Sequence, residues 1–214
     1  MRKKHIVCFG DSNTWGYDAV SGGRFDEDTR WTQLLQQRLG EQYLVLEEGV
    51  NGRTTAIDDP RFEGLCGRRA LPIAMMAHSP VDCLVIMLGT NDCKALFSAS
   101  VRHINDGLCR LVHAVKYQRD VWADQARILL VAPIVMGEEL YTVPDILAEM
   151  GEGSVEKSRA LPAVFLETAR RFGCEYMDCN PYVTPDTVDY MHFDAVSHAR
   201  FAEAVADQLN KMGV

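Results

Sequence analysis

Residues 5–16 read HIVCFGDSNTWG, a short apolar run that leads directly into a turn of small polar residues. The run at residues 5–9 is rich in apolar side chains and does not alternate with polar ones. Such a run is typical of a strand that is covered on both faces, as in a parallel sheet. Gly10 and the polar residues after it favour a tight turn that opens a helix, with the Ser12 hydroxyl at the edge of the sheet.

Four more apolar runs have the same character, at residues 43–46, 83–88, 128–132 and 175–177. Between the runs lie stretches with apolar residues at helical spacing, at residues 31–39, 104–115, 164–172 and 201–209. Gly40 and Gly173 are placed to end two of these helices, and Asp194 is placed to cap the last one. Alternating strands and helices predict a three-layer α/β/α sandwich around a doubly wound parallel sheet.

The chain has 214 residues, of which 47% are hydrophobic and 24% are charged, as is usual for a globular protein. No repeat or linker divides it, so we expect residues 1–214 to form a single domain. The formal net charge of −8 argues against nucleic acid and anionic membrane surfaces as partners. The apolar runs are too short for a membrane span or a signal peptide, so we expect a cytoplasmic protein. The seven cysteines and six histidines lack the spacing of a metal site or a disulfide framework, which predicts reduced thiols and no metal.

Small polar motifs follow three predicted strands or precede the last predicted helix. They are Gly10-Asp11-Ser12, Gly49-Val50-Asn51-Gly52, Gly89-Thr90-Asn91-Asp92 and Asp189-Tyr190-Met191-His192. Each motif alone has an ordinary explanation, such as a helix cap, an Asn-Gly turn or a hydrogen-bonded surface residue. Together they are more informative, because loops after different strands of a parallel sheet meet at one edge.

The residue types in these motifs match the needs of acyl transfer. A serine hydroxyl such as that of Ser12 is a weak nucleophile until a nearby base accepts its proton. His192 is the candidate base, and Asp189 is the candidate carboxylate that orients the imidazole. Asn91 and the backbone at Gly52 are candidates for donating hydrogen bonds to the negative oxygen that forms during attack.

With these four blocks in this order, the sequence resembles the SGNH hydrolases of the GDSL esterase/lipase superfamily. Residues 8–16, 47–60 and 85–94 are similar to the arylesterase and acyltransferase branch. The resemblance implies a flavodoxin-like fold with a five-stranded sheet, and no metal or cofactor. It further implies that Ser12 is the nucleophile, His192 the general base and Asp189 the orienting acid. The implied oxyanion hole consists of the Ser12 N–H, the Gly52 N–H and the Asn91 side chain.

One position departs from the family pattern, because the nucleophile motif commonly continues with Leu where this chain has Asn13. Substrate-binding roles are predicted for four residues in or near the blocks, namely Asp11, Asn13, Trp15 and Lys94. Two long loops, residues 51–69 and 136–154, are expected to shape the pocket, the second with a short helix near residues 145–150.

The predicted function is that of a serine esterase that hydrolyses short-chain aryl or alkyl esters, with acyl transfer to alcohols as an extension from the branch. A carbohydrate O-deacetylase or a thioesterase would use the same three residues. An alternative from another class is a non-catalytic flavodoxin-like module that holds a phosphate or nucleotide at the helix start by Ser12. The expected partner is a small-molecule ester, and homo-oligomers are common among soluble enzymes.

Overall fold

The central sheet has five parallel strands, which a computed structural model covering residues 2–214 places in the order β4-β1-β5-β6-β7. The strands are β1 (Lys4–Gly10), β4 (Tyr43–Gly49), β5 (Val81–Met87), β6 (Trp122–Ala132) and β7 (Glu175–Asp178). Counted within this sheet alone, the order is 2-1-3-4-5, which is that of flavodoxin-like folds. The predicted fold class and all five predicted strands are confirmed.

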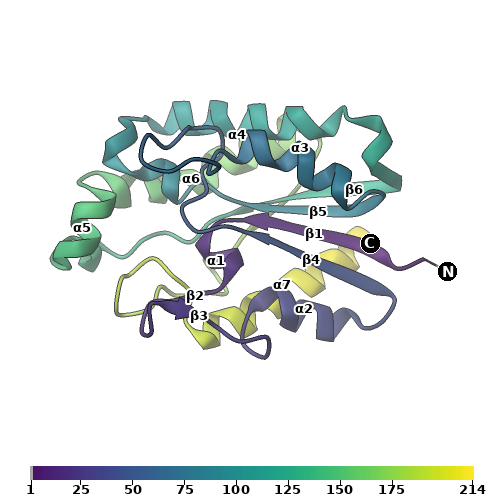
Figure 1. Cartoon of the computed structure of the whole chain (residues 1–214), viewed down its shortest axis with the longest axis horizontal. Helices are drawn as coiled ribbons and strands as arrows, with labels where there is room; N and C mark the ends of the chain where they lie inside the picture. Colours follow the sequence, from purple (N-terminus) through teal and green to yellow (C-terminus); the bar gives the residue numbers. More distant parts are fainter. Residues whose placement is uncertain (1) are drawn as a thin grey trace.

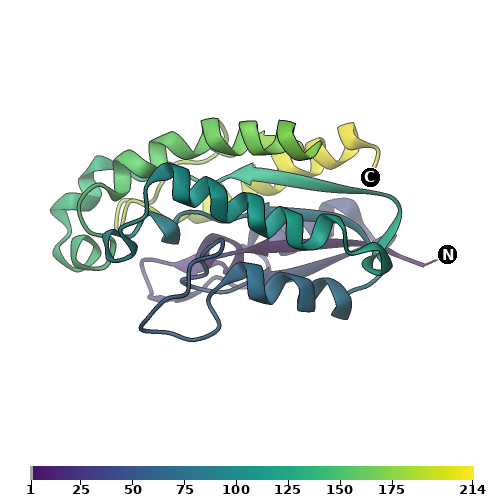
Figure 2. The same cartoon turned by 90° about the horizontal axis from the view of Figure 1, so that it is seen from above.

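Helices cover both faces of the sheet (Figures 1 and 2). One face carries α3 (Gly67–Ala77), α4 (Val101–Lys116) and α6 (Ser154–Phe172). The other face carries α2 (Trp31–Leu39) and α7 (Ala195–Met212). The three layers therefore form the predicted α/β/α sandwich.

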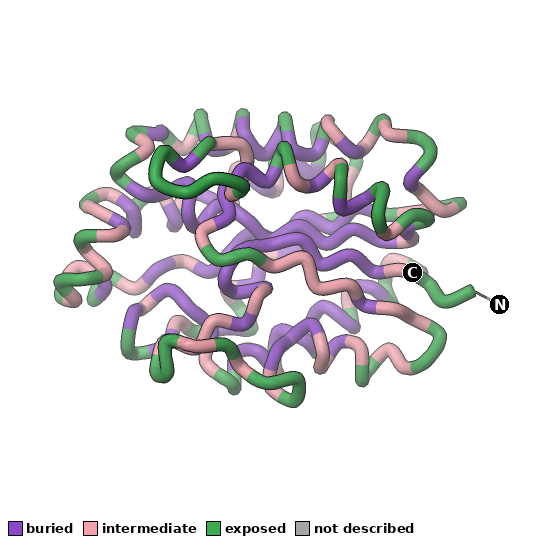
Figure 3. The backbone as a smooth tube through the Cα atoms, in the orientation of Figure 1, coloured by how far each residue is buried: buried purple, intermediate pink, exposed green. Residues whose placement is uncertain are grey.

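The alternation of side chains along β1 explains why this strand is apolar throughout. Val7 and Phe9 belong to the core under α3, α4 and α6, whereas Ile6 and Cys8 belong to the core under α2 and α7. All four residues are at most 1% exposed. Figure 3 shows the same burial along the central strands. A strand between two helical layers has no face left for polar residues.

The helix ends also follow the sequence signals. Gly40 and Gly173 follow α2 and α6 with φ angles of 77° and 60°, where a glycine has no steric penalty. The Asp194 carboxylate caps α7 by accepting a hydrogen bond from the Ser197 N–H at 2.7 Å. The short helix α5 (Pro144–Met150) lies in the second long loop, as predicted.

Three elements differ from the sequence-based expectation. Residues 67–77 form α3 with Pro72 inside it, although no helix was predicted there and residues 67–69 were expected to belong to a loop. Residues after the short helix α1 (Ser12–Trp15) form a small hairpin of β2 (Tyr17–Asp18) and β3 (Gly23–Arg24). Strand β6 begins at Trp122 rather than at residue 128. Its first half is largely polar and contains a register shift against β5, which apolar patterning does not detect.

The carboxyl ends of the three strands that precede the candidate motifs lie at the same level of the sheet. Gly10 is opposite Gly49 in β4 and opposite Met87 in β5. The loops that follow these strands therefore start side by side, next to α1 and α5 (Figure 1). Among residues 2–214, we find no helix with the length and apolar character needed to cross a bilayer.

Candidate active site

Ser12 is the first residue of α1, directly after β1. The Asp11 carboxylate caps this helix by accepting a hydrogen bond from the Asn13 N–H at 3.1 Å. Strand β4 passes very close to the turn, because a Cβ atom added at Gly49 would lie 2.2 Å from the Trp15 nitrogen. Only glycine fits at Gly49, so the tight turn at Ser12 depends on a residue from the neighbouring strand.

His192 lies in a turn that the Asp189 carboxylate holds together. Asp189 Oδ1 accepts hydrogen bonds from the N–H groups of Met191 and His192, both at 3.0 Å. Tyr190, which follows Asp189 in this turn, has a φ of 59°, an uncommon value for a residue with a side chain. The Asp186 N–H closes the base of the loop by donating to the His192 carbonyl at 2.9 Å.

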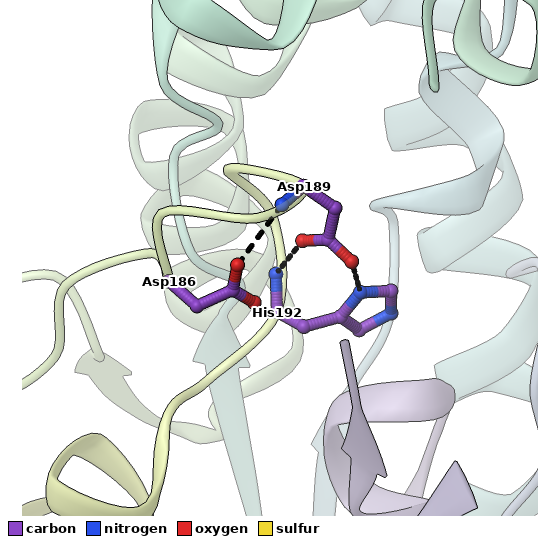
Figure 4. Close-up of side chains that lie close together, drawn as sticks. All are labelled: Asp186, Asp189 and His192. Carbon is purple, nitrogen blue, oxygen red and sulfur yellow. Dashed lines mark hydrogen bonds and ion pairs between the residues drawn. The ribbon is translucent and has the colours of Figure 1, made fainter. Parts of the chain in front are cut away.

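The two segments meet through a chain of three side chains. His192 Nδ1 lies 2.5 Å from Asp189 Oδ2, and His192 Nε2 lies 2.8 Å from Ser12 Oγ. Figure 4 shows the Asp189 carboxylate bonded to both the backbone N–H and the ring of His192. Ser12 and His192 are each 7% exposed, so both groups are largely shielded from water. This is the arrangement that a serine hydroxyl needs in order to lose its proton to an imidazole.

The electrostatics of Asp189 favour its ionised form. Burial alone would raise the pKa of Asp189, but hydrogen bonds from the His192 ring and two backbone N–H groups lower that pKa below its ordinary value. Asp186 lies behind it, with Oδ1 accepting from the N–H groups of Val188 and Asp189 at 2.6 and 2.9 Å. Burial raises the pKa of Asp186, and the nearby Asp189 charge raises it further.

Asp186, Asp189 and His192 also form a group of metal-ligand type. Their ligand atoms lie within 4.8 Å of one another. His192 Nδ1 and Asp189 Oδ2 already form a hydrogen bond with each other, and a metal ion would have to replace that bond. We therefore assign these atoms to the Ser12–His192–Asp189 chain.

The predicted oxyanion donors belong to three loops, and their residues Ser12, Gly52 and Asn91 line the same cavity. Within residues 2–214, neither the Ser12 N–H nor the Gly52 N–H donates a hydrogen bond to another group. Gly52 has a φ of 82°, a conformation that glycine adopts readily. Asn91 Nδ2 donates one hydrogen bond to the Arg53 carbonyl at 3.2 Å, which fixes the amide and leaves its second N–H available.

A cavity of about 530 Å³ opens onto Ser12 and His192. Its walls are mainly apolar and come from both long loops as well as from the β2 hairpin. The apolar and aromatic lining residues are Tyr17, Phe62, Leu65, Met150 and Met191. The sequence indicated the two loops but not these side chains, whose direction depends on how the loops fold over the sheet.

Four residues were predicted to bind substrate, and the cavity is lined by only one of them, Lys94. Asp11 is buried beneath the turn. Trp15 stacks with Arg24, whose guanidinium carbon lies 5.1 Å from the ring centre. The Asn13 side chain neither lines the cavity nor bonds within its own turn. Its side chain donates to the Met191 carbonyl at 3.2 Å and accepts from the Phe193 N–H at 2.9 Å, and so joins the Ser12 turn to the His192 loop.

Lys94 belongs to an ion-pair network at the cavity wall. Lys94 Nζ lies 2.5 Å from Glu149 Oε1, and Arg61 donates to both carboxylate oxygens of Glu149 at 3.0 Å. Glu149 therefore links the loop that carries Arg61 to the segment after β5. The ammonium group of Lys94 is already neutralised, so it offers little free charge to a substrate.

Asp11 predicts a specific pH dependence of stability. Burial raises the pKa of Asp11 from 3.8 to about 6, and its Oδ2 atom has no hydrogen-bond partner within residues 2–214. The folded state holds the Asp11 proton more tightly than the unfolded state does. Protonated Asp11 therefore stabilises the fold below about pH 4, and this contribution is lost as the pH rises through about 6. Asp11→Asn should remove this dependence. The free energy of unfolding of the wild type relative to Asp11→Asn should fall by about 2.5 kcal/mol from pH 4 to pH 8.

Urea unfolding of both proteins at several pH values measures this difference. Asp58→Asn is the control, because the Asp58 side chain is 62% exposed. An equal pH dependence in the wild type and Asp11→Asn would contradict the prediction.

Comparison with solved structures gives close likeness over almost the whole chain. An aryl esterase of M. smegmatis is 34% identical with a TM-score of 0.89, and the match covers 98% of this chain and 99% of that one. Est24, a carbohydrate acetylesterase from Sinorhizobium meliloti, is 32% identical with a TM-score of 0.90 over the same shares of the two chains. A search of curated protein sequences gave no significant match.

The family assignment comes from the sequence itself. The model of the GDSL-like lipase/acylhydrolase family matches residues 8–200, which include all four motif blocks. The resemblance noted from those blocks is thereby confirmed. The chain belongs to the GDSL-like lipase/acylhydrolase family and is a carboxylic ester hydrolase.

Proposed function

We propose that the protein is a serine esterase that hydrolyses short-chain aryl or alkyl esters through an acyl-enzyme on Ser12. The observation that carries the proposal is the continuous hydrogen-bond chain from Ser12 Oγ through the His192 ring to Asp189, with distances of 2.8 and 2.5 Å, facing the cavity. The proposal assigns Ser12 as nucleophile, His192 as general base and Asp189 as the group that orients the imidazole.

In the first step, Ser12 Oγ attacks the ester carbonyl carbon while His192 Nε2 takes the hydroxyl proton. The tetrahedral intermediate collapses when His192 returns that proton to the alcohol oxygen, which leaves as the free alcohol. Asp189 keeps the second ring proton on Nδ1 and stabilises the imidazolium that forms. The remaining product is an ester between the acyl group and Ser12.

In the second step, water attacks the acyl-enzyme with His192 again as base. The carboxylic acid leaves, and Ser12 Oγ regains its proton from His192. In both steps the carbonyl oxygen becomes negatively charged. The N–H groups of Ser12 and Gly52 and the Asn91 amide are assigned as donors to this oxygen, because donors already in place lower the barrier most.

The cavity supports small apolar substrates over sugars. A volume of about 530 Å³ suits a small ligand. Phe62, Leu65 and Met150 provide apolar surface for an aryl or alkyl group, whereas a sugar needs several polar partners. One of the similar structures is an aryl esterase, which agrees with this choice. Another is a carbohydrate acetylesterase, so deacetylation of sugars is the second candidate.

Parallel kinetics would separate these candidates. We expect the highest kcat/KM for 4-nitrophenyl acetate, a lower value for 4-nitrophenyl octanoate, and lower values again for acetylated xylose and an acetyl thioester. A higher kcat/KM for acetylated xylose than for the aryl acetate would contradict the proposed substrate class and would indicate a carbohydrate ester instead.

Acyl transfer to alcohols is part of the same proposal. An apolar cavity favours an alcohol over water as the acceptor for the acyl-enzyme. With 4-nitrophenyl acetate and added benzyl alcohol, we expect benzyl acetate to form alongside acetate. Acetate as the only acyl product would restrict the activity to hydrolysis.

A phosphate or nucleotide at the start of α1 is not supported. Helix α1 has four residues, and the Asp11 carboxylate already accepts the Asn13 N–H at its start. A carboxylate in this place would repel a phosphate.

Asn91→Ala provides a test of the oxyanion assignment. Loss of one such donor should lower kcat by about 10²- to 10³-fold with little change in KM, because the hydrogen bond strengthens only as the oxygen becomes charged. Asn51→Ala is the matched control, since Asn51 lines the same cavity but has no assigned role. Equal kcat values for Asn91→Ala and wild type would remove Asn91 from the oxyanion hole.

A further inference from the structure

A buried arginine lies between the loops that carry the three oxyanion donors. Arg53 follows Gly52 directly and is 4% exposed, and it does not line the cavity. A role in contacting substrate is therefore excluded by its position. Its polar contacts instead join the ends of the strands on which the proposed oxyanion hole is built.

The side chain of Arg53 bridges the ends of β1 and β4. Arg53 Nη1 donates to the Gly10 carbonyl at 3.1 Å and also to the Glu48 carbonyl. Gly10 is the last residue of β1 and stands two residues before Ser12. The Gly10 carbonyl also accepts from the Val50 N–H at 3.2 Å, so both contacts draw the loop after β4 toward the Ser12 turn.

The backbone of Arg53 holds the other two donors. Its N–H closes a turn around Gly52 by donating to the Val50 carbonyl at 3.1 Å. Its carbonyl accepts from Asn91 Nδ2 at 3.2 Å, in the loop after β5. One residue therefore contacts the segments that carry the Ser12 N–H, the Gly52 N–H and the Asn91 amide.

This arrangement is costly for folding, and stability alone does not explain it. Within residues 2–214, no carboxylate forms an ion pair with Arg53, and its buried Nε has no hydrogen-bond partner. The Phe9 ring partly compensates for the lost hydration of the guanidinium charge, because its centre lies 4.0 Å from the guanidinium carbon. Burial lowers the pKa of Arg53 to about 10, which reflects the same cost. Such costs are tolerated where a side chain serves a functional site.

We propose that Arg53 is a positioning residue that sets the distances between the three oxyanion donors. The proposal rests on the proposed function, because it assumes that these groups form the oxyanion hole. A planar guanidinium can reach two carbonyls in a fixed geometry, and small displacements of catalytic groups have large effects on rate.

The test compares Arg53→Met and Arg53→Lys with wild type on 4-nitrophenyl acetate. Fluorophosphonate titration counts the competent Ser12 sites, so that kcat refers to folded enzyme only. Arg53→Met should lower kcat per site by about 10- to 100-fold and leave KM within about twofold. Arg53→Lys keeps the charge but not the planar geometry, and should lower kcat by about 3- to 10-fold.

A double-mutant cycle with Asn91→Ala separates positioning from a general structural role. If Arg53 acts through the oxyanion donors, the combined loss in Arg53→Met with Asn91→Ala should be smaller than the product of the two single losses. Arg30→Met is the matched control, because Arg30 is also 4% exposed but its side chain pairs with the Glu47 carboxylate and bonds none of the loops that carry the oxyanion donors. Arg30→Met should lower the melting temperature and keep kcat per site close to the wild-type value.

Wild-type kcat per site in Arg53→Met, or losses that multiply fully in the double variant, would overturn the proposal. If Arg53→Met does not fold, Arg53→Lys decides, and a wild-type kcat there would overturn it. A failure of the proposed function is distinguishable, because Ser12→Ala or Asn91→Ala would then retain activity whatever the Arg53 variants do.

Discussion

Ser12→Ala should lower kcat/KM for 4-nitrophenyl acetate by about 10⁴- to 10⁶-fold, to the level left by binding and the oxyanion donors alone. The reason is that no other group within reach of His192 Nε2 takes the place of the Ser12 hydroxyl, 2.8 Å away. Removing the hydroxyl removes covalent catalysis and leaves only direct attack by water. The measurement is initial-rate kinetics on protein purified from a fresh column for each variant, to avoid carry-over of wild type.

The control for this variant is Ser21→Ala. Ser21 is exposed and hydrogen-bonds Asp18 in the β2–β3 hairpin. The Ser21→Ala variant should retain wild-type activity. Activity of Ser12→Ala at the wild-type level would refute the assignment of Ser12 as nucleophile.

Asp189→Asn should lower kcat/KM by about 10³- to 10⁴-fold while the fold stays intact. The carboxylate accepts a hydrogen bond from the N–H at His192 Nδ1 and so keeps the ring proton there, which leaves Nε2 free to take the proton of Ser12. An amide nitrogen facing Nδ1 would favour the opposite tautomer, with the proton on Nε2. The imidazole could then no longer act as a base toward Ser12.

Asp186→Asn is the matched control, because Asp186 is the neighbouring carboxylate in the same loop. Its Oδ1 accepts backbone N–H groups, which an amide oxygen can also do. We expect its kcat/KM to stay close to wild type. Similar losses in the two variants would mean that the loop conformation, and not the Asp189–His192 bond, is the important feature.

Most of the fold could be predicted from the sequence because the strands are buried on both faces. Apolar runs such as residues 5–9 and 83–88 have no other stable place in a protein of this size. The helix α3 was missed because Pro72 lies inside it and because its start overlaps a region that resembles a loop. The first half of β6 was missed because it is polar and irregular, which apolar patterning cannot detect.

The candidate site was predicted in part for a similar physical reason. Residues after the strands of a parallel sheet meet at one edge, so Ser12, Asn91 and His192 were expected to be close. The cavity wall was not predictable, because Phe62 and Met150 come from loops whose course depends on contacts across the molecule. The contacts of Asn13 with the His192 loop link positions 178 and 180 residues apart, and no local pattern indicates them.

The most direct test of the account is labelling with a fluorophosphonate followed by peptide mapping. This reagent reacts with serine hydroxyls that a neighbouring base has activated. We predict a single labelled peptide that carries the reagent on Ser12, and a much slower reaction in His192→Ala. Labelling on a different serine, or an equal rate of Ser12 labelling in His192→Ala, would contradict the proposal that Ser12 and His192 form the catalytic pair.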